Sequence, residues 1–170
     1  MNLEGLSIVL HPAEILTSVA TPVERVDDDI RALAHAMVEL MDQADGVGLA
    51  APQVGVGLRM FVTIDPEDER GAQVWINPEL EVIDETSQSG IEGCLSLPGI
   101  DVSVARPRGV RIRGLGLDGQ MREAESCEHI ARVWQHEHDH LDGRLIIDRM
   151  STMDRMRNRR ALRALIGRAT

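Results

Sequence analysis

Residues 135–141 read QHEHDHL, and this stretch carries the strongest indication of structure and function in the chain. On an α-helix, residues four apart lie one turn apart on the same face, so His136 and His140 can direct two imidazole nitrogens at one metal ion. Glu137 stands beside them as a candidate general base. His138 points to roughly the opposite side, and we expect no metal role for it. The alternative is an exposed, charged helix that matches the pattern by chance.

The composition is that of a globular protein. The chain has 170 residues, of which 43% are hydrophobic and 27% charged, and we expect residues 1–170 to form a single catalytic domain. Aromatic residues are restricted to Trp75, Trp134 and Phe61, which argues against a single-stranded nucleic-acid surface built on base stacking. All 18 basic residues are arginine, so the absence of lysine excludes Schiff-base chemistry.

The net charge of −10 is unevenly distributed. Residues 144–170 hold eight Arg and two Asp (8 − 2 = +6), so the remainder carries −16 (10 Arg against 26 acidic residues). Residues 151–170 are predicted to form a basic C-terminal helix that begins near Ser151 or Thr152 and ends before Gly167. Two interpretations remain open: a solvated helix packed through its apolar side, or a basic surface that docks on phosphate-rich nucleic acid.

The cysteine content and hydropathy point to a reducing compartment. Cys94 and Cys127 are too few for a disulfide framework. No apolar run approaches the ~20 residues needed to cross a bilayer, and the N-terminus lacks the basic region of a signal peptide. We therefore expect a cytoplasmic protein with no membrane partner and no specific DNA partner.

The pattern of apolar residues and turn signals predicts an α+β fold. We expect short antiparallel β-strands packed around a central metal-binding helix, with an N-terminal helix and a C-terminal helix. The N-terminal residues 1–26 are predicted to form an extended arm, and the helices to span 28–44 (capped by Asp27 or Asp28) and 126–141 (capped by Ser126, ended at 142–143). The predicted strands are 59–64, 73–76, 79–84, 102–105, 110–117 and 121–124. Turn signals occur at 65–66, 77–78, 89–90, 98–99, 106–107 and 118–119.

A glycine-rich segment follows the first predicted helix. Residues 46–57 read GVGLAAPQVGVG. A phosphate-binding loop is disfavoured because lysine is absent and no strand precedes the segment. The glycines either permit a tight backbone path or let the backbone approach a ligand closely.

Two histidines make an incomplete metal site, because a catalytic centre of the zinc type has three protein ligands and one open position. The third ligand must be Cys94, Cys127, an acidic residue or another histidine. Cys94 is best placed, since it follows Gly93, where the backbone can turn a side chain into a cleft. Cys127 lies nine residues before His136, about 13 Å away along a regular helix axis, and cannot join the pair there.

These residues permit metal-assisted hydrolysis of an amide or ester. A Cys-His-His site would hold one divalent ion and lower the pKa of a bound water, whose proton Glu137 can accept. Attack on a carbonyl creates an oxyanion that requires placed hydrogen-bond donors. The side-chain amide of Gln53 and the backbone N–H of Leu95 are candidates.

Three separate blocks of the sequence resemble the signature motifs of peptide deformylases. They are GVGLAAPQ at 46–53, EGCLS at 92–96 and QHEHDHL at 135–141, and the resemblance covers roughly residues 5–165. It implies removal of the formyl group from N-formylmethionine at the start of new bacterial polypeptides. Cys94, His136 and His140 would bind the metal, natively Fe²⁺, with Zn²⁺, Ni²⁺ or Co²⁺ as substitutes.

The resemblance also implies roles for other residues. Glu137 would be the acid and base, and Gln53 and the Leu95 N–H would stabilise the oxyanion. The predicted substrate-binding residues are Val47, Gly48, Glu92, Gly93, His129 and Val133, with Val47 and Gly48 pairing with the substrate backbone. The basic C-terminal helix is similar to the segment that docks bacterial type I enzymes on the ribosome.

The sequence departs from the family pattern at three places. Thr17 stands where an arginine is common, Asp101 where a substrate-contacting arginine is frequent, and Glu128-His129 where Gly-Leu is usual. His129 either makes the methionine pocket more polar or packs at its mouth. The alternative functions are a zinc endopeptidase, an N-acyl amidase on another substrate, or a non-catalytic RNA-binding module.

Overall fold

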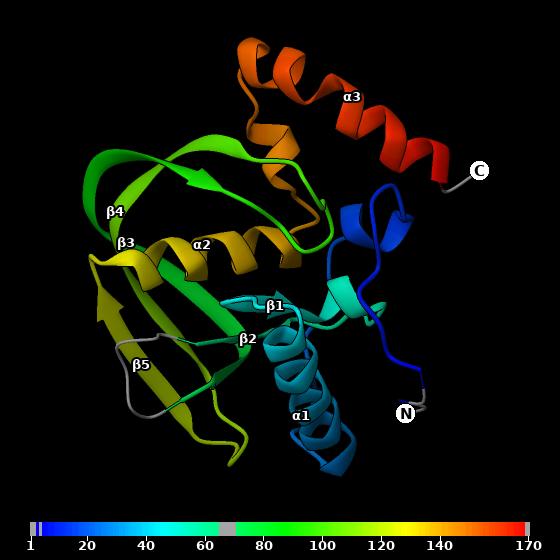
Figure 1. Cartoon of the computed structure of the whole chain (residues 1–170). Helices are drawn as coiled ribbons and strands as arrows, with labels where there is room; N and C mark the ends of the chain where they lie inside the picture. The colour runs from blue at the N-terminus through cyan, green and yellow to red at the C-terminus, as the bar shows by residue number, and fades with distance from the viewer. Residues whose placement is uncertain (1–2, 4, 65–70, 169–170) are drawn as a thin grey trace.

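The computed structural model describes residue 3 and residues 5–64 and 71–168. In this part of the chain one α-helix precedes five consecutive strands and two α-helices follow them, as Figure 1 shows. The strands are β1 (Gly48–Ala50), β2 (Met60–Thr63), β3 (Gln73–Glu92), β4 (Val102–Leu115) and β5 (Met121–Ser126). The helices are α1 (Asp28–Gln43), α2 (His129–Leu141) and α3 (Thr152–Arg168), with 3-10 turns η1 (Glu14–Thr17), η2 (Ala51–Val54) and η3 (Ile146–Arg149). The predicted α+β class is confirmed.

The sheet is antiparallel throughout, and each strand pairs with its neighbour in sequence, in the order β1-β2-β3-β4-β5. Consecutive strands that are joined without a crossover connection pair in this antiparallel way. β1 therefore forms one edge of the sheet, where it pairs with β2 on one side. The glycine-rich segment supplies both this edge strand and the turn η2 that follows it.

α1 packs on the sheet through one apolar face. The carboxylate of Asp27 accepts a hydrogen bond from the Ile30 N–H (3.1 Å), which satisfies one free donor of the first turn. The buried side chains recur at helical spacing: Ile30, Leu33, Ala34, Met37 and Met41. They form one hydrophobic cluster with side chains of β1, β2 and β3. The predicted helix over 28–44 is confirmed to within one residue.

α2 is the central element, because it contacts all five strands. The prediction that it begins at Ser126 was wrong: the helix starts at His129, since residues up to Ser126 extend β5 and pair with β4. The Ser126 hydroxyl accepts a hydrogen bond from the Glu128 N–H (3.0 Å) instead of capping a helix. The predicted end is confirmed, with Asp142 as C-cap and Gly143 at φ 69°.

β3 and β4 are longer than predicted, because each joins two predicted strands. β3 runs through the turn signals at 77–78 and 89–90, and β4 runs through 106–107. Shifts in register, one of them between Ile76 and Glu79, absorb the extra residues, and Asn77 adopts a φ of 50° within the first. The turns at 98–99 and 118–119 are confirmed. The turn predicted at 65–66 lies outside the described residues.

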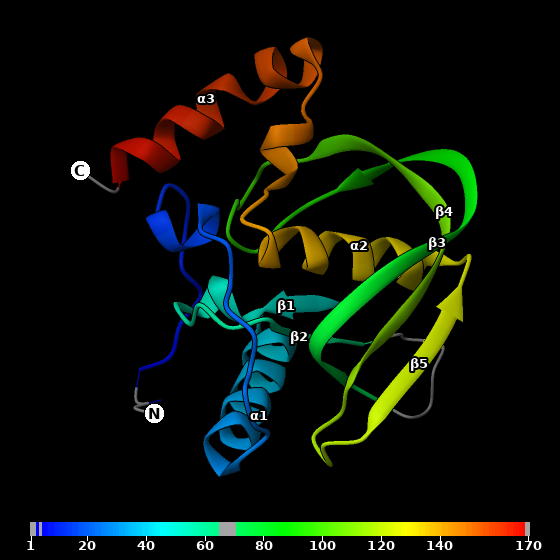
Figure 2. The same cartoon turned by 180° about the vertical axis from the view of Figure 1, so that it is seen from behind.

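α3 lies beside the N-terminal arm (Figure 2), and its Leu165 joins a buried hydrophobic cluster that includes Leu16 and Val104 of β4. The Ser151 hydroxyl accepts a hydrogen bond from the Asp154 N–H (3.0 Å) at its start. The prediction that the helix ends before Gly167 was wrong, because it continues to Arg168; a single glycine costs about 1 kcal/mol in a helix and does not forbid it. Of the helices described, none has the length and apolar character needed to cross a membrane.

Candidate metal centre

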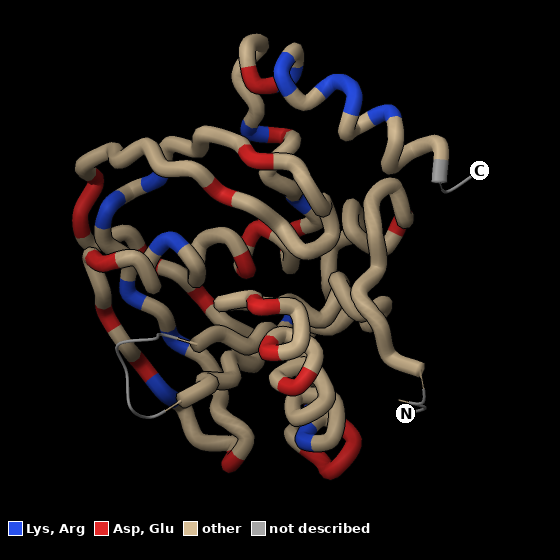
Figure 3. The backbone as a smooth tube through the Cα atoms, in the orientation of Figure 1, with Lys and Arg blue, Asp and Glu red and all other residues tan. Residues whose placement is uncertain are grey.

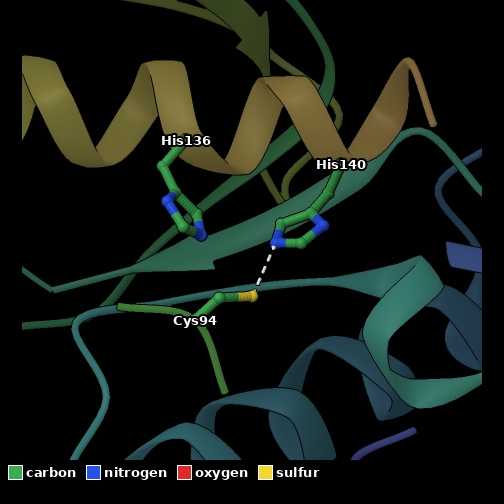
Figure 4. Close-up of side chains that lie close together, drawn as sticks. All are labelled: Cys94, His136 and His140. Carbon is green, nitrogen blue, oxygen red and sulfur yellow. Dashed lines mark hydrogen bonds between the residues drawn. The ribbon is translucent and has the colours of Figure 1, made fainter. Parts of the chain in front are cut away.

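Three side chains with metal-ligating atoms converge between α2 and the segment that follows β3 (Figure 4). One ligand atom each of Cys94, His136 and His140 lies within 4.8 Å of the other two. Cys94 Sγ is 3.3 Å from His140 Nε2, and the two imidazole centroids are 5.1 Å apart. Among the residues the structure describes, no other group of three His, Cys, Asp or Glu side chains comes this close. The side chains predicted as ligands are therefore brought together.

The donor set fits a divalent metal ion. One thiolate and two imidazoles from three positions leave room for a further ligand, as in catalytic metal sites. His136 turns Nδ1 toward Glu92 Oε2 (3.0 Å), which leaves Nε2 for the ion. The buried Nδ1 of His140 has no hydrogen-bond partner within the described chain.

Burial and neighbouring groups shift the pKa values of the two histidines in opposite directions. Burial lowers the pKa of His136, but hydrogen bonds with Cys94 and Glu92 outweigh it and raise the pKa to about 10. Burial and the adjacent His136 hold the pKa of His140 well below its ordinary value. A lowered pKa favours the neutral imidazole at His140, which is the form that binds a metal ion.

The carboxylate of Glu137 lies against the edge strand β1. A Cβ built at Gly48 would overlap Glu137 Oε1 and sit 2.9 Å from its Cγ, so only glycine leaves room for the acid there. Glu137 is buried, and its Oε2 has no hydrogen-bond partner among the described residues. Burial raises the pKa of Glu137 to about 7, against the charges of His136 and Arg106. A carboxyl with that pKa can both accept and return a proton near neutral pH.

The side-chain amide of Gln53 is held in one orientation. Its Oε1 accepts a hydrogen bond from the Ala50 N–H (2.8 Å), so its Nε2 must face the other way. Nε2 lies 3.5 Å from Cys94 Sγ and 3.3 Å from the Ser96 hydroxyl. A fixed N–H donor therefore points at the centre from η2.

A cavity of about 330 Å³ opens in front of these groups, a volume in the range of small-ligand sites. Every predicted site residue except His140 lines it: Val47, Gly48, Gln53, Glu92, Gly93, Cys94, Leu95, His129, Val133, His136 and Glu137. His140 is buried behind them. At the mouth, His129 is exposed on the first turn of α2, and Val133 is buried one turn later.

The model of the polypeptide deformylase family matches residues 6–156. The chain belongs to the polypeptide deformylase family. The curated peptide deformylase of Azotobacter vinelandii is 45% identical over 157 residues, covering 92% of this chain and 94% of that one. The Pseudomonas aeruginosa peptide deformylase is 44% identical over the same shares of both chains.

Solved deformylase structures share the fold. The crystal structure of a peptide deformylase from Legionella pneumophila superposes with a TM-score of 0.86 at 38% identity, covering 93% of each chain. The Thermotoga maritima deformylase gives a TM-score of 0.81 at 40% identity, over 86% of this chain and 97% of that one. The family is one of metalloenzymes, in agreement with the donor set found here.

The departures from the deformylase pattern lie outside the three converging side chains. Thr17 ends η1, where its exposed hydroxyl bonds the Glu14 carbonyl. Asp101 is exposed, and its Oδ1 would lie 3.4 Å from a Cβ at Gly93. His129 occupies the cavity mouth as described above.

Glu92 was predicted to bind substrate, but its carboxylate serves other partners. Both oxygens accept hydrogen bonds from Arg106 (2.6 and 2.8 Å), one also from Arg132 (2.8 Å), and Oε2 faces His136. Burial alone would raise the pKa of Glu92, yet Arg106, His136 and Arg132 hold it far below its ordinary value. This geometry favours a role in orienting His136 rather than in touching substrate.

Sequence reasoning missed Arg106, whose side chain is 3% exposed and which also donates to Asp139 (2.9 Å). A signal was available. Val102, Val104 and Arg106 have the same parity along β4, and the two valines face the core. An arginine at a core-facing position must be paired with buried carboxylates.

The remaining candidates lie away from the centre. His138 is 3.4 Å from Arg59 Nη2 and 3.6 Å from Asp142, on the opposite side of α2 from Cys94. Cys127 is not on the helix as expected, but in the short link between β5 and α2, with a Cβ at Gly109 just 2.6 Å from its Sγ. Neither side chain belongs to the three-residue centre.

Proposed function

We propose that this protein hydrolyses the N-formyl group from the formylmethionine that begins newly synthesised polypeptides. Membership of the deformylase family supports the reaction, and one observation carries it: the ligand atoms of Cys94, His136 and His140 lie within 4.8 Å of one another beside the buried Glu137. Because new chains are made in the cytoplasm, we propose that compartment for the enzyme.

Cys94, His136 and His140 would hold one divalent ion. We propose Fe²⁺, on the family likeness and on the preference of a mixed thiolate and imidazole set for such ions, with Zn²⁺, Ni²⁺ or Co²⁺ as substitutes. When bound, the ion supplies a Lewis acid that polarises the formyl oxygen and acidifies water.

Glu137 is proposed as the proton carrier. Its carboxylate accepts the proton of the attacking water and returns it to the nitrogen of the leaving methionine. Its pKa of about 7, raised by burial, suits both steps near neutral pH. The overlap with a Cβ at Gly48 means that β1 sets where the carboxylate can stand.

Gln53 and Leu95 are proposed as oxyanion donors. The Gln53 Nε2 is turned toward Cys94 by the Ala50 hydrogen bond, and such preset donors stabilise developing negative charge without reorganisation. The Leu95 N–H follows the ligand cysteine directly in the chain.

The substrate is proposed to add a short strand at the open edge of β1. Val47 and Gly48 have the backbone groups for this pairing, beside a cavity lined by Gly93, His129 and Val133 that would accept the methionine side chain. Glu92 stays a proposed lining residue, although its carboxylate points elsewhere.

We further propose that α3 docks on the ribosome. The helix carries six arginines and one aspartate, and Figure 3 shows the arginines spaced along it. A triple charge reversal of Arg159, Arg160 and Arg163 to Glu tests this proposal. Arg25→Glu and Arg108→Glu are controls, because both residues lie outside α3. Loss of each phosphate contact should reduce the slope of log affinity against log salt by about 1. Unchanged ribosome affinity would leave α3 as a packing element.

The activity itself is tested on a short formylmethionyl peptide with anaerobically purified, metal-loaded protein. Formate release, with no cleavage of the matching acetylmethionyl peptide, is expected. Release of acetate would indicate a broader N-acyl amidase, and cleavage of internal peptide bonds would indicate an endopeptidase. An inert, metal-loaded protein would refute the proposal.

A further inference from the structure

A largely buried chain of ion pairs runs from the metal-side histidine to the segment before α3. His136 Nδ1 is 3.0 Å from Glu92 Oε2, and Arg106 grips both oxygens of Glu92 at 2.6 and 2.8 Å. The remaining nitrogen of Arg106, Nη1, donates to Asp139 Oδ2 (2.9 Å). Asp139 then accepts two more hydrogen bonds from Arg149, from Nε at 2.9 Å and from Nη2 at 2.6 Å.

Asp139 is thus shared between two guanidinium groups. Because Arg149 engages both of its oxygens, Arg149 fixes the plane of the Asp139 carboxylate and offsets its charge. Without Arg149, the full charge of Asp139 would act on Arg106. This stronger attraction would weaken the two hydrogen bonds from Arg106 to Glu92. In a buried network, the loss of one interaction weakens the neighbouring ones.

The position of Arg149 makes this effect unexpected. It ends η3, the last turn before α3, and it is neither one of the three converging ligands nor one of the residues that line the cavity. Its side chain is 35% exposed, whereas those of Arg106 and Glu92 are 3% and 5% exposed. A substitution at Arg149 can therefore alter the network without placing an unpaired charge in the core.

We propose that Arg149 is a positioning residue for His136, acting through Asp139, Arg106 and Glu92. The proposal rests on the proposed metal set of Cys94, His136 and His140. A residue outside the cavity would then set how firmly the centre binds its ion. The competing explanation is that Arg149 only anchors η3 to α2.

The test compares full-length wild type with Arg149→Met, Arg149→Lys and the control Arg155→Met. Arg155 is exposed on α3 and donates to the Ile147 carbonyl (3.2 Å), so its loss removes a nearby arginine without touching Asp139. Each protein is loaded with Co²⁺. The visible spectrum reports the ligand field and the thiolate bond, chelator competition reports affinity, and kcat and KM are measured on the formylmethionyl peptide.

Arg149→Met should bind Co²⁺ about tenfold more weakly, the low end of effects seen for groups that support metal ligands, with a shifted spectrum and a lower kcat at similar KM. Arg149→Lys keeps the charge but not the paired donors, and should recover part of the affinity. Arg155→Met should match wild type. In the background of Asp139→Asn, Arg149→Met should have little further effect.

The outcomes separate this inference from the proposed function. If wild type binds Co²⁺ in the expected thiolate site but Arg149→Met keeps the same spectrum and affinity, Arg149 does not position His136. An equal change in Arg155→Met would also overturn the inference, because it would trace the effect to packing of the C-terminal segment. If wild type itself binds no ion, it is the metal set that fails.

Discussion

A Cβ added at Gly48 would lie only 2.8 Å from the carboxylate carbon of Glu137, so no side chain fits between α2 and the edge strand β1 at this point. The strand β1, which would pair with substrate, therefore also restricts the position of the Glu137 carboxylate, the proposed proton carrier. The contact links the first and third sequence motifs physically.

Gly48→Ala should displace the Glu137 carboxylate. We expect kcat to fall by about 10²-fold, the low end of general acid–base contributions, while the protein stays folded. Steady-state kinetics and circular dichroism measure the two quantities. Gly57→Ala is the matched control, since a Cβ there meets nothing within 4 Å. An equal fall in kcat in both variants would show that the overlap at Gly48 does not affect catalysis.

Glu137→Gln should remove activity without lowering stability. Burial raises the pKa of this carboxyl to about 7, so its surroundings do not favour the ionised form that the amide replaces. We expect at least a ~10²-fold fall in kcat and an unchanged or higher thermal midpoint. A variant that kept wild-type kcat would show that the proton passes elsewhere.

Cys94→Ala should lose its metal, whereas Cys127→Ala should keep it. Cys94 Sγ lies 3.3 Å from His140 Nε2, while Cys127 lies outside the converging group. Metal content by elemental analysis and formate release give the result. Chelation of wild type should abolish activity, and added Fe²⁺ or Co²⁺ should restore it. Full metal occupancy in Cys94→Ala would exclude it as a ligand.

His129→Leu should improve recognition of methionine. The substitution places apolar surface at the cavity mouth beside Val133. Burying one or two further methylene groups would lower KM about four- to fifteenfold with kcat nearly unchanged. A formylalanyl peptide serves as control, because its side chain is too short to contact the side chain at position 129. A raised KM for the methionyl peptide would instead mark His129 as a useful polar contact.

Arg106→Met should destabilise the fold by about 3–5 kcal/mol, because it leaves Glu92 and Asp139 as buried carboxylates with a lost partner. Denaturant unfolding measures the change. Arg108→Met, two residues along β4, removes a half-exposed arginine that is 3.6 Å from Asp84, and should cost at most about 1 kcal/mol. Similar costs at both positions would argue against a critical network.

The centre was predictable from sequence because its residues obey local rules. The spacing of His136 and His140 fixes one face of a helix, and the glycine before Cys94 marks a turn into a cleft. The ends of elements were less accessible. Ser126 is a good helix cap in isolation, but its backbone groups are used by the ladder between β4 and β5.

The supporting network could not be read from spacing. Glu92, Arg106 and Asp139 are separated along the chain, and only the pairing of β3 with β4 and the packing of α2 bring them together. The inward parity of Arg106 signals a buried charge, yet not its partners. Arg149 had no signal of its own among the many arginines of the C-terminal segment.

The N-terminal arm joins parts of the chain that are made far apart in time. The Val9 N–H bonds the Gln53 carbonyl (2.7 Å), the His11 N–H bonds the Ser96 carbonyl (3.0 Å), and the Ala20 N–H bonds the Leu141 carbonyl (2.9 Å). During translation, the three N–H donors are synthesised well before the carbonyl groups that accept their hydrogen bonds. The site therefore cannot be completed before residues up to Leu141 have been synthesised, and a chain that ends before His140 lacks one of the three converging side chains.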